Sequence, residues 1–143
     1  MSTMIEFSES SLTDEEQSIV TNGFEQQSAL SMAPEYVSST VAWKQYSDER
    51  QLVAVLTGKQ LWDWLYVDEL FVIESQRGNG LGKTLLIEAE RYANKQSLTG
   101  IWLWTQSWQA EDFYKRLGYH EFCRFPDFPK GFQRIGLRKQ LQG

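Results

Sequence analysis

The spacing of apolar residues changes several times along the chain, and each change predicts a new secondary-structure element. Residues 62–72 are almost continuously apolar and rich in aromatic and β-branched side chains, which predicts a buried strand. After a glycine-rich stretch, Leu85, Leu86 and Ala89 begin a spacing of three and four residues that predicts a helix with one apolar face. The chain is therefore organised around a strand that turns through glycines into a helix.

The N-terminal part predicts a short strand, a helix and a hairpin. Residues 4–8 form the candidate strand. Thr13 is the expected N-cap of a helix that ends near Ser31, and three acidic residues occupy its first turn, where negative charge is favourable. Alternation of apolar and polar residues then predicts two strands, at 39–46 and 51–57, joined by a turn.

The C-terminal part predicts three more strands and one helix. An apolar strand covers residues 100–105. The helix covers 109–117 and ends before Gly118, because glycine favours the left-handed conformation that terminates helices. Two closing strands are expected at 119–125 and 132–137.

This order of elements predicts the α/β class. With 143 residues, of which 41% are hydrophobic, the chain can form one substantial core, so we expect a single domain over residues 1–143. The expected architecture is a mixed, mostly antiparallel sheet of about six to seven strands flanked by helices.

The net charge and the cysteine content exclude several classes of function. A net charge of -5 argues against sequence-independent binding to nucleic acid and to anionic membranes. Cys123 is the sole cysteine, which excludes a disulfide within the chain and suits a reducing compartment, so we expect a cytoplasmic protein. Together with the sole histidine, His120, it cannot form a structural zinc tetrad, and we expect no metal site.

The glycine-rich stretch at residues 76–84 has the features of a phosphate-binding loop. A helix N-terminus offers unpaired N–H groups and partial positive charge, and glycines remove side chains that would block a ligand. A Walker A loop would need glycine at Arg77, and a dinucleotide fingerprint would need one at Lys83, so neither motif fits. A loop that merely turns the chain is the alternative.

Two motifs together resemble the GNAT superfamily of acyl-CoA-dependent N-acyltransferases. The first is Arg77-x-x-Gly80-x-Gly82. The second lies at residues 107–119 and is similar to the family's Asn-x-x-Ala-x-x-Phe-Tyr-x-x-x-Gly-Phe pattern, with Ser107 standing where asparagine is usual. The motifs and the order of elements around them extend the resemblance over about residues 40–138.

The resemblance implies acetyl-CoA as cosubstrate, bound in a cleft beside the central strand. The pantetheine arm is expected to pair with the backbone of that strand, and the pyrophosphate with loop N–H groups. Both motifs therefore contribute to the expected cofactor-binding set, which is Leu70, Phe71, Val72, Arg77, Gly78, Asn79, Gly80, Leu81, Gly82, Lys83 and Ser107.

The resemblance also implies the catalytic groups. Tyr114 matches the usual general acid, and an ordinary phenol with a pKa near ~10 is protonated at neutral pH; packing alone is its alternative role. Asp68 matches the position of a base that acts through water. Alternation puts Asp68 and Glu69 on opposite faces, and Glu69 becomes the candidate base if the strand bulges. Structural hydrogen bonding is the alternative for both acids.

The expected function is an N-acetyltransferase that moves an acetyl group from acetyl-CoA to a primary amine. The acceptor is a small molecule or a peptide amine, with Trp108 as the expected lining residue, and a homodimer is compatible with these features. The alternative is a catalytically weak acyl-CoA-binding domain with a regulatory or interaction role.

Overall fold

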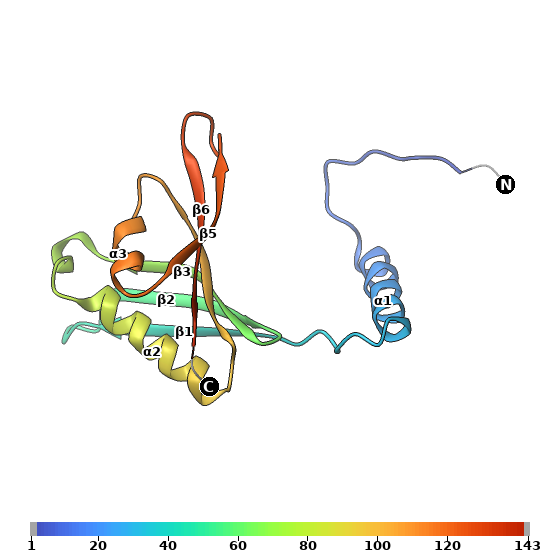
Figure 1. Cartoon of the computed structure of the whole chain (residues 1–143). Coiled ribbons are helices and arrows are strands. Elements are labelled where there is room, and N and C mark those ends of the chain that lie inside the picture. The colour runs from blue at the N-terminus through green and yellow to red at the C-terminus, as the bar shows by residue number, and fades with distance from the viewer. Residues whose placement is uncertain (1–2, 142–143) are drawn as a thin grey trace. The chain divides into compact units, whose positions relative to one another are not determined.

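The computed structural model describes residues 3–141, and the chain forms two compact units, Met1–Tyr36 and Val37–Gly143, which are described separately (Figure 1). The first unit holds α1. The second holds the sheet and the remaining helices. The elements are α1 Asp14–Leu30, β1 Ser38–Tyr46, β2 Leu52–Leu61, β3 Trp64–Val72, the short 3₁₀ turn η1 Glu74–Gln76, α2 Leu81–Lys95, β4 Gly100–Gln106, α3 Glu111–Arg116, β5 His120–Pro126 and β6 Gln133–Gln140.

Helix α1 begins where the sequence predicts. The Glu16 N–H donates to Thr13 Oγ1 at 3.2 Å, and the Thr13 N–H donates to Glu16 Oε1 at 2.8 Å, so a reciprocal capping box confirms Thr13 as N-cap. The strand predicted at residues 4–8 is wrong. Ile5 and Phe7 are exposed, and a strand forms only where a neighbour pairs its backbone; within residues 3–141 none pairs with this segment.

The second unit contains one six-stranded sheet with the order β1-β2-β3-β4-β6-β5. Only β3 and β4 pair in parallel, and the other four neighbouring pairs are antiparallel. Helix α2 makes the connection between the two parallel strands, as a parallel pair requires. The predicted mixed, mostly antiparallel sheet is confirmed. No helix within residues 3–141 has the length and apolarity needed to span a bilayer.

The hairpin of β2 and β3 is longer than the sequence predicts and contains a bulge. Strand β2 continues through Gly58, because the missing side chain lets β3 approach; an added Cβ would lie 2.5 Å from the Tyr66 carbonyl oxygen. Here the register shifts: Gly58 pairs with Val67, whereas Thr57 pairs with Glu69. The residue between them on β3, Asp68, is therefore the extra residue of a β-bulge.

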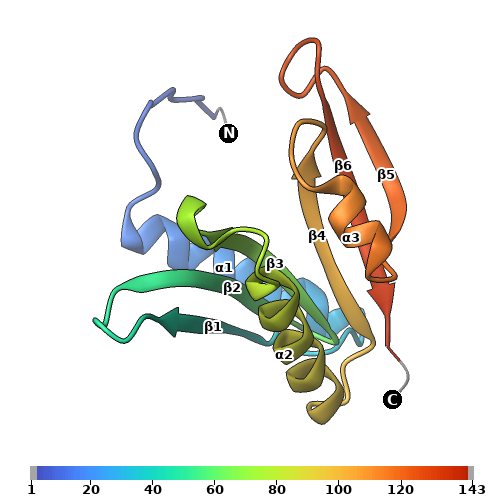
Figure 2. The ribbon, with the colours of Figure 1, turned by 90° about the vertical axis from the view of Figure 1, so that its left-hand side faces the viewer.

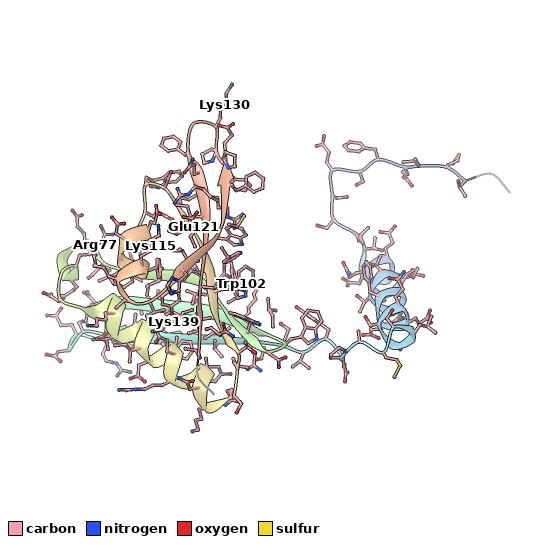
Figure 3. All side chains as sticks on the ribbon, in the orientation of Figure 1. Arg77, Trp102, Lys115, Glu121, Lys130 and Lys139 are labelled. Carbon is pink, nitrogen blue, oxygen red and sulfur yellow. The ribbon has the colours of Figure 1, made fainter. Side chains whose placement is uncertain are left out.

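Helices α2 and α3 pack on the same face of the sheet. Every second side chain of the central strands points toward this face. Leu86 of α2 and Tyr114 of α3 join one continuous buried cluster with these strand residues. The opposite face carries aromatic side chains, of which Trp102 is one (Figure 3). The largest side chains that are almost fully buried are Leu56, Leu65, Leu86, Ile101, Leu103, Tyr119, Ile135 and Leu137.

Strands β3 and β4 separate along their length. They pair only from Trp64 with Gly100 to Val67 with Leu103, although β3 continues to Val72. Beyond that point β3 remains paired with β2, and β4 remains paired with β6. Figure 2 shows the two halves of the sheet diverging, with β4, β6 and β5 forming the upright half.

Helix α3 is shorter than the predicted 109–117, but it ends as predicted. Gln109 lies outside the helix because its Oε1 accepts from the Gln106 N–H at 3.1 Å. Gly118 follows the helix with φ of +95°, the left-handed conformation expected there. Lys115 of α3 lies 3.7 Å from Glu121 of β5, so the helix is tied electrostatically to the edge strand (Figure 3).

Replacing Gly58 with alanine tests the close approach of β2 and β3. The new Cβ would clash with the Tyr66 carbonyl, which belongs to rigid backbone, so we expect a loss of about 1–3 kcal/mol in the free energy of unfolding by urea denaturation. The control is Gly23→Ala in α1, where an added Cβ meets no atom within 4 Å and helix propensity improves. Equal stability of G58A and wild type would contradict the close approach.

Candidate active site

A cleft of about 650 Å³ lies where β3 and β4 separate. We call it the strand cleft. Residues of the bulged part of β3 form one side, and residues from the end of β4 to α3 form the other. It is lined by Val67, Asp68, Glu69, Leu70, Phe71, Val72, Arg77, Leu103, Trp104, Thr105, Gln109, Ala110 and Tyr114.

Within residues 3–141, the edge of β3 that faces this cleft has no partner strand after Val67. Backbone N–H and C=O groups that point away from β2 are therefore available to an extended ligand with amide groups of its own. Leu70, Phe71 and Val72, which belong to the predicted cofactor-binding set, all lie on this segment. The cleft can accept a flexible, amide-containing arm as an added strand.

The glycine loop between β3 and α2 is open at the start of the helix. Gly80 is the N-cap with φ of +79°, and in the described part of the chain no side-chain hydrogen bond caps the start of α2. Gly78 has φ of +85°, and an added Cβ at either glycine would meet no atom within 4 Å. Neither glycine is needed for packing, and the uncovered N–H groups of Gly82 and Lys83 fit a phosphate.

Arg77 connects this loop to the end of β3. Its Nε donates to the Val72 carbonyl at 3.0 Å, and its guanidinium lies 5.8 Å from the centroid of the Phe71 ring. Lys83 is exposed on the first turn of α2, and Leu81 packs against the core. Asn79 Nδ2 donates to Gln76 at 3.4 Å. Arg77 therefore holds the loop beside the cleft in addition to carrying charge.

Tyr114 is buried in α3 and lines the strand cleft. Its ring contacts Phe113 and Tyr119 edge-on, with centroids 5.1 Å and 5.8 Å away. Burial raises the pKa of its hydroxyl to about 12. The phenol consequently keeps its proton at neutral pH more firmly than the sequence alone would suggest.

Asp68 and Glu69 line the same cleft. The opposite faces expected from strict alternation are wrong, because Val67 before the two acids and Leu70 after them both contact the core. The bulge at Asp68 interrupts the alternation. The two acids nevertheless differ in their contacts. Glu69 Oε1 accepts from Thr57 Oγ1 at 2.9 Å, whereas Asp68 also lines a second cavity.

This second cavity, which we call the polar cavity, has a volume of about 300 Å³ and adjoins the strand cleft. The two share four residues, so Asp68 lies where they meet. Sequence analysis missed most of the lining, because residues from three segments far apart in the chain come together here. The polar cavity is lined by Tyr66, Asp68, Trp104, Thr105, Gln106, Gln109, Phe128 and Arg134.

Two residues singled out by the sequence lie outside both cavities. Ser107 Oγ accepts from the Gln133 N–H at 3.1 Å, and the Ser107 N–H donates to the Gln133 carbonyl at 2.8 Å, which extends the contact of β4 with β6. Trp108 packs edge-on against Phe132 and does not line either cavity. Residues 3–141 contain no group of three or more potential metal ligands.

The strand cleft lies between two diverging parallel strands, and a glycine loop leads from β3 into the start of α2. Together these features define an acyl-CoA-dependent transferase. The sequence profile of the Acetyltransferase (GNAT) family matches residues 6–119. The chain belongs to this family. It is an N-acetyltransferase, and its cosubstrate is acetyl-CoA.

Named relatives agree with this assignment. Blasticidin-S acetyltransferase of Streptomyces morookaense is 38% identical over 92 residues, which cover 64% of this chain and 68% of that protein. An acetyltransferase of Agrobacterium fabrum is 36% identical over 95 residues, covering 66% and 69%. The crystal structure of an acetyltransferase from Bacillus cereus is 30% identical with a TM-score of 0.83, covering 97% of this chain and 98% of that one.

Acetyl-CoA should raise the melting temperature of the protein, because a ligand that binds only the folded state stabilises it. Gly80→Val should abolish this rise by obstructing the N–H groups at the start of α2. The expected measurement is a thermal melt with and without acetyl-CoA at millimolar concentration.

Gly131→Val is the matched control. Gly131 also has positive φ, +87°, with no atom within 4 Å of an added Cβ, so both variants suffer a similar backbone strain. Only G80V should lose the acetyl-CoA effect. Retention of the full effect in G80V would show that the loop does not hold the cosubstrate.

Proposed function

We propose that the enzyme acetylates a primary amine by direct attack on acetyl-CoA, with Tyr114 as general acid and Asp68 as general base acting through water. The observation that carries the proposal is the position of Asp68, where the strand cleft meets the polar cavity. At this position the Asp68 carboxylate can accept the proton of an amine in the polar cavity while that amine attacks a thioester in the strand cleft.

Binding of acetyl-CoA would use backbone groups more than side chains. We assign the pantetheine arm to the unpaired edge of β3 at residues 70–72 and the pyrophosphate to the loop at residues 77–83. Acetyl-CoA supplies the acetyl thioester. Ser107 is the weakest member of the predicted set, because its hydroxyl already accepts from Gln133.

The transfer requires two proton movements. The amine nitrogen forms a bond to the thioester carbonyl carbon as its proton passes through water to Asp68. The carbon–sulfur bond breaks, and the leaving sulfur receives the hydroxyl proton of Tyr114. The products are an acetamide and the free thiol of CoA, and a backbone N–H near Val72 stabilises the negative charge on the carbonyl oxygen.

We propose a small-molecule amine as acceptor. The polar cavity is small, about 300 Å³, and side chains of both sheet halves line it. The name of the Streptomyces relative states a small-molecule acceptor, blasticidin S, and this supports the same class here. We also propose that residues 1–143 form one acetyltransferase domain, since the family profile starts at residue 6 and includes α1.

Tyr114→Phe should lower turnover by roughly 10²-fold, the scale of a lost general acid, while the affinity for acetyl-CoA changes by no more than a few-fold. Initial rates of thiol release and a thermal-shift titration measure the two effects separately. Phenylalanine keeps the ring contacts of the buried side chain, so folding provides no other cause for a loss. Unchanged turnover would limit Tyr114 to packing.

The pH–rate profile of the wild type gives a second measurement of the same residue. Because burial raises the pKa of Tyr114 to about 12, the phenol stays protonated from pH 7 to 10. We expect no loss of turnover through tyrosine ionisation in this range. A decline in turnover with a midpoint near pH 9, absent from Tyr114→Phe, would contradict the buried environment.

Asp68→Asn should lower the rate most at low pH, and raising the pH should partly restore it, because more of the amine is then neutral without a base. Glu69→Gln is the comparison, since Glu69 lines the same cleft but accepts a hydrogen bond from Thr57. A wild-type pH profile for D68N and a defect in E69Q would reverse the assignment. Wild-type profiles for both would exclude a side-chain base.

A further inference from the structure

Arg134 gives the polar cavity a positive charge that the acetyl-transfer chemistry does not use. Its guanidinium carbon lies 4.7 Å from the centroid of the Trp104 ring and 4.9 Å from that of Phe128. Arginine stacked on aromatic rings keeps its N–H donors at the guanidinium edge, where they remain able to bind other groups. The two rings therefore fix the position of the charge without neutralising it.

The main chain of the loop that carries Phe128 is hydrogen-bonded to a side chain of β4. With its amide nitrogen directed at the loop, Gln106 donates to the Phe128 carbonyl at 2.9 Å and to the Gln133 carbonyl at 3.0 Å. Gln109 Oε1 accepts from the Gln106 N–H at 3.1 Å and from Thr105 Oγ1 at 3.4 Å, which leaves the N–H₂ group of Gln109 as a donor. The cavity thus presents donors from two neighbouring side chains.

None of the ion pairs among residues 3–141 involves Arg134. Arg124 shows the contrast, since it pairs with Glu111 at 2.7 Å and Glu121 at 2.6 Å. A half-buried guanidinium with no carboxylate partner is a ready binding group for an anion. Asp68 lines the same cavity, and the ion pairs among residues 3–141 do not include one between Asp68 and Arg134, so a positive and a negative group line one small volume.

The charges of Asp68 and Arg134 both affect the pKa of the Tyr66 hydroxyl. Burial and the nearby Asp68 carboxylate raise its pKa, while Arg134 acts in the opposite direction. This combination shows that Asp68 and Arg134 act on one region of the cavity rather than on separate surfaces. An acceptor that fills the cavity would meet both.

We infer that the acceptor is an amine that also carries a carboxylate, with the amine at Asp68 and the carboxylate bound by the guanidinium of Arg134. This inference rests on the proposed function and names its substrate class. Arg134 determines which acceptor is bound and takes no part in making or breaking covalent bonds. The carboxylate of the acceptor is not altered by the reaction. A planar guanidinium matches a carboxylate with two parallel N–H donors, which a neutral amide cannot use equally.

The test compares matched acceptors. A series of ω-amino acids, with one to five carbons between amine and carboxylate, is assayed beside the corresponding carboxamides for thiol release from acetyl-CoA. At the best spacing, kcat/KM for the carboxylate should exceed that for the carboxamide roughly ten- to hundredfold, the scale of a charge-assisted hydrogen bond. In Arg134→Gln this ratio should fall toward one, and Arg134→Lys should keep part of it.

Arg138→Gln is the matched control. Arg138 lies four residues further along β6 and also contacts an aromatic ring, at 5.9 Å from the centroid of Trp64, but it lines a separate apolar pocket. R138Q should retain the wild-type ratio. The acetyl-CoA thermal shift should be equal in R134Q, R138Q and wild type, which shows that each variant is folded and binds its cosubstrate.

The outcomes separate the inference from the proposed function. Equal rates for carboxylates and carboxamides in the wild type, with no change of the ratio in R134Q, would overturn the inference and leave amine acetylation standing. Turnover only of amines without any carboxylate, such as diamines, would do the same. Absence of thiol release with every amine, despite a thermal shift by acetyl-CoA, would overturn both.

Discussion

The end of parallel pairing between β3 and β4 is the constraint on which the rest of the site depends. Beyond Val67 and Leu103 each strand keeps its other neighbour, so the sheet stays intact while its two halves diverge. This leaves one edge of β3 with unpaired backbone groups facing a cleft of about 650 Å³. Sheet edges are usually covered or paired, and here a ligand that resembles a strand is the natural partner.

The β-bulge at Asp68 lies directly after this point and determines which side chains face the cleft. It is stabilised from β2, where Gly58 lets the Tyr66 carbonyl approach an otherwise blocked position. Without the extra residue, the side chains of Asp68 and Glu69 would alternate between the two faces. With it, both acids line the cleft, and Asp68 also reaches the polar cavity.

The two cavities have different physical characters that suit two different substrates. The strand cleft offers backbone groups and a buried, protonated Tyr114 whose pKa is raised to about 12. The polar cavity offers opposite charges, with Arg134 held by the Trp104 and Phe128 rings. A backbone-lined cleft accepts a ligand largely independently of side-chain identity, whereas the charged cavity selects by chemical type. Under the proposed function, the strand cleft holds the cosubstrate and the polar cavity selects the acceptor.

The sequence by itself determined the sheet class, the glycine loop, the N-cap of α1 and the family, because these depend on local patterns: 3.6-residue and 2-residue periodicity, a capping residue, and glycines at a helix start. It also indicated Tyr114, Asp68 and Glu69 through short motifs. Tertiary structure alone decided the bulge, which local alternation cannot reveal, and the polar cavity, whose residues come from β3, β4, β6 and the connecting loops. It also decided that residues 4–8 form no strand, since a strand requires a partner backbone and sequence pattern describes only one chain segment at a time.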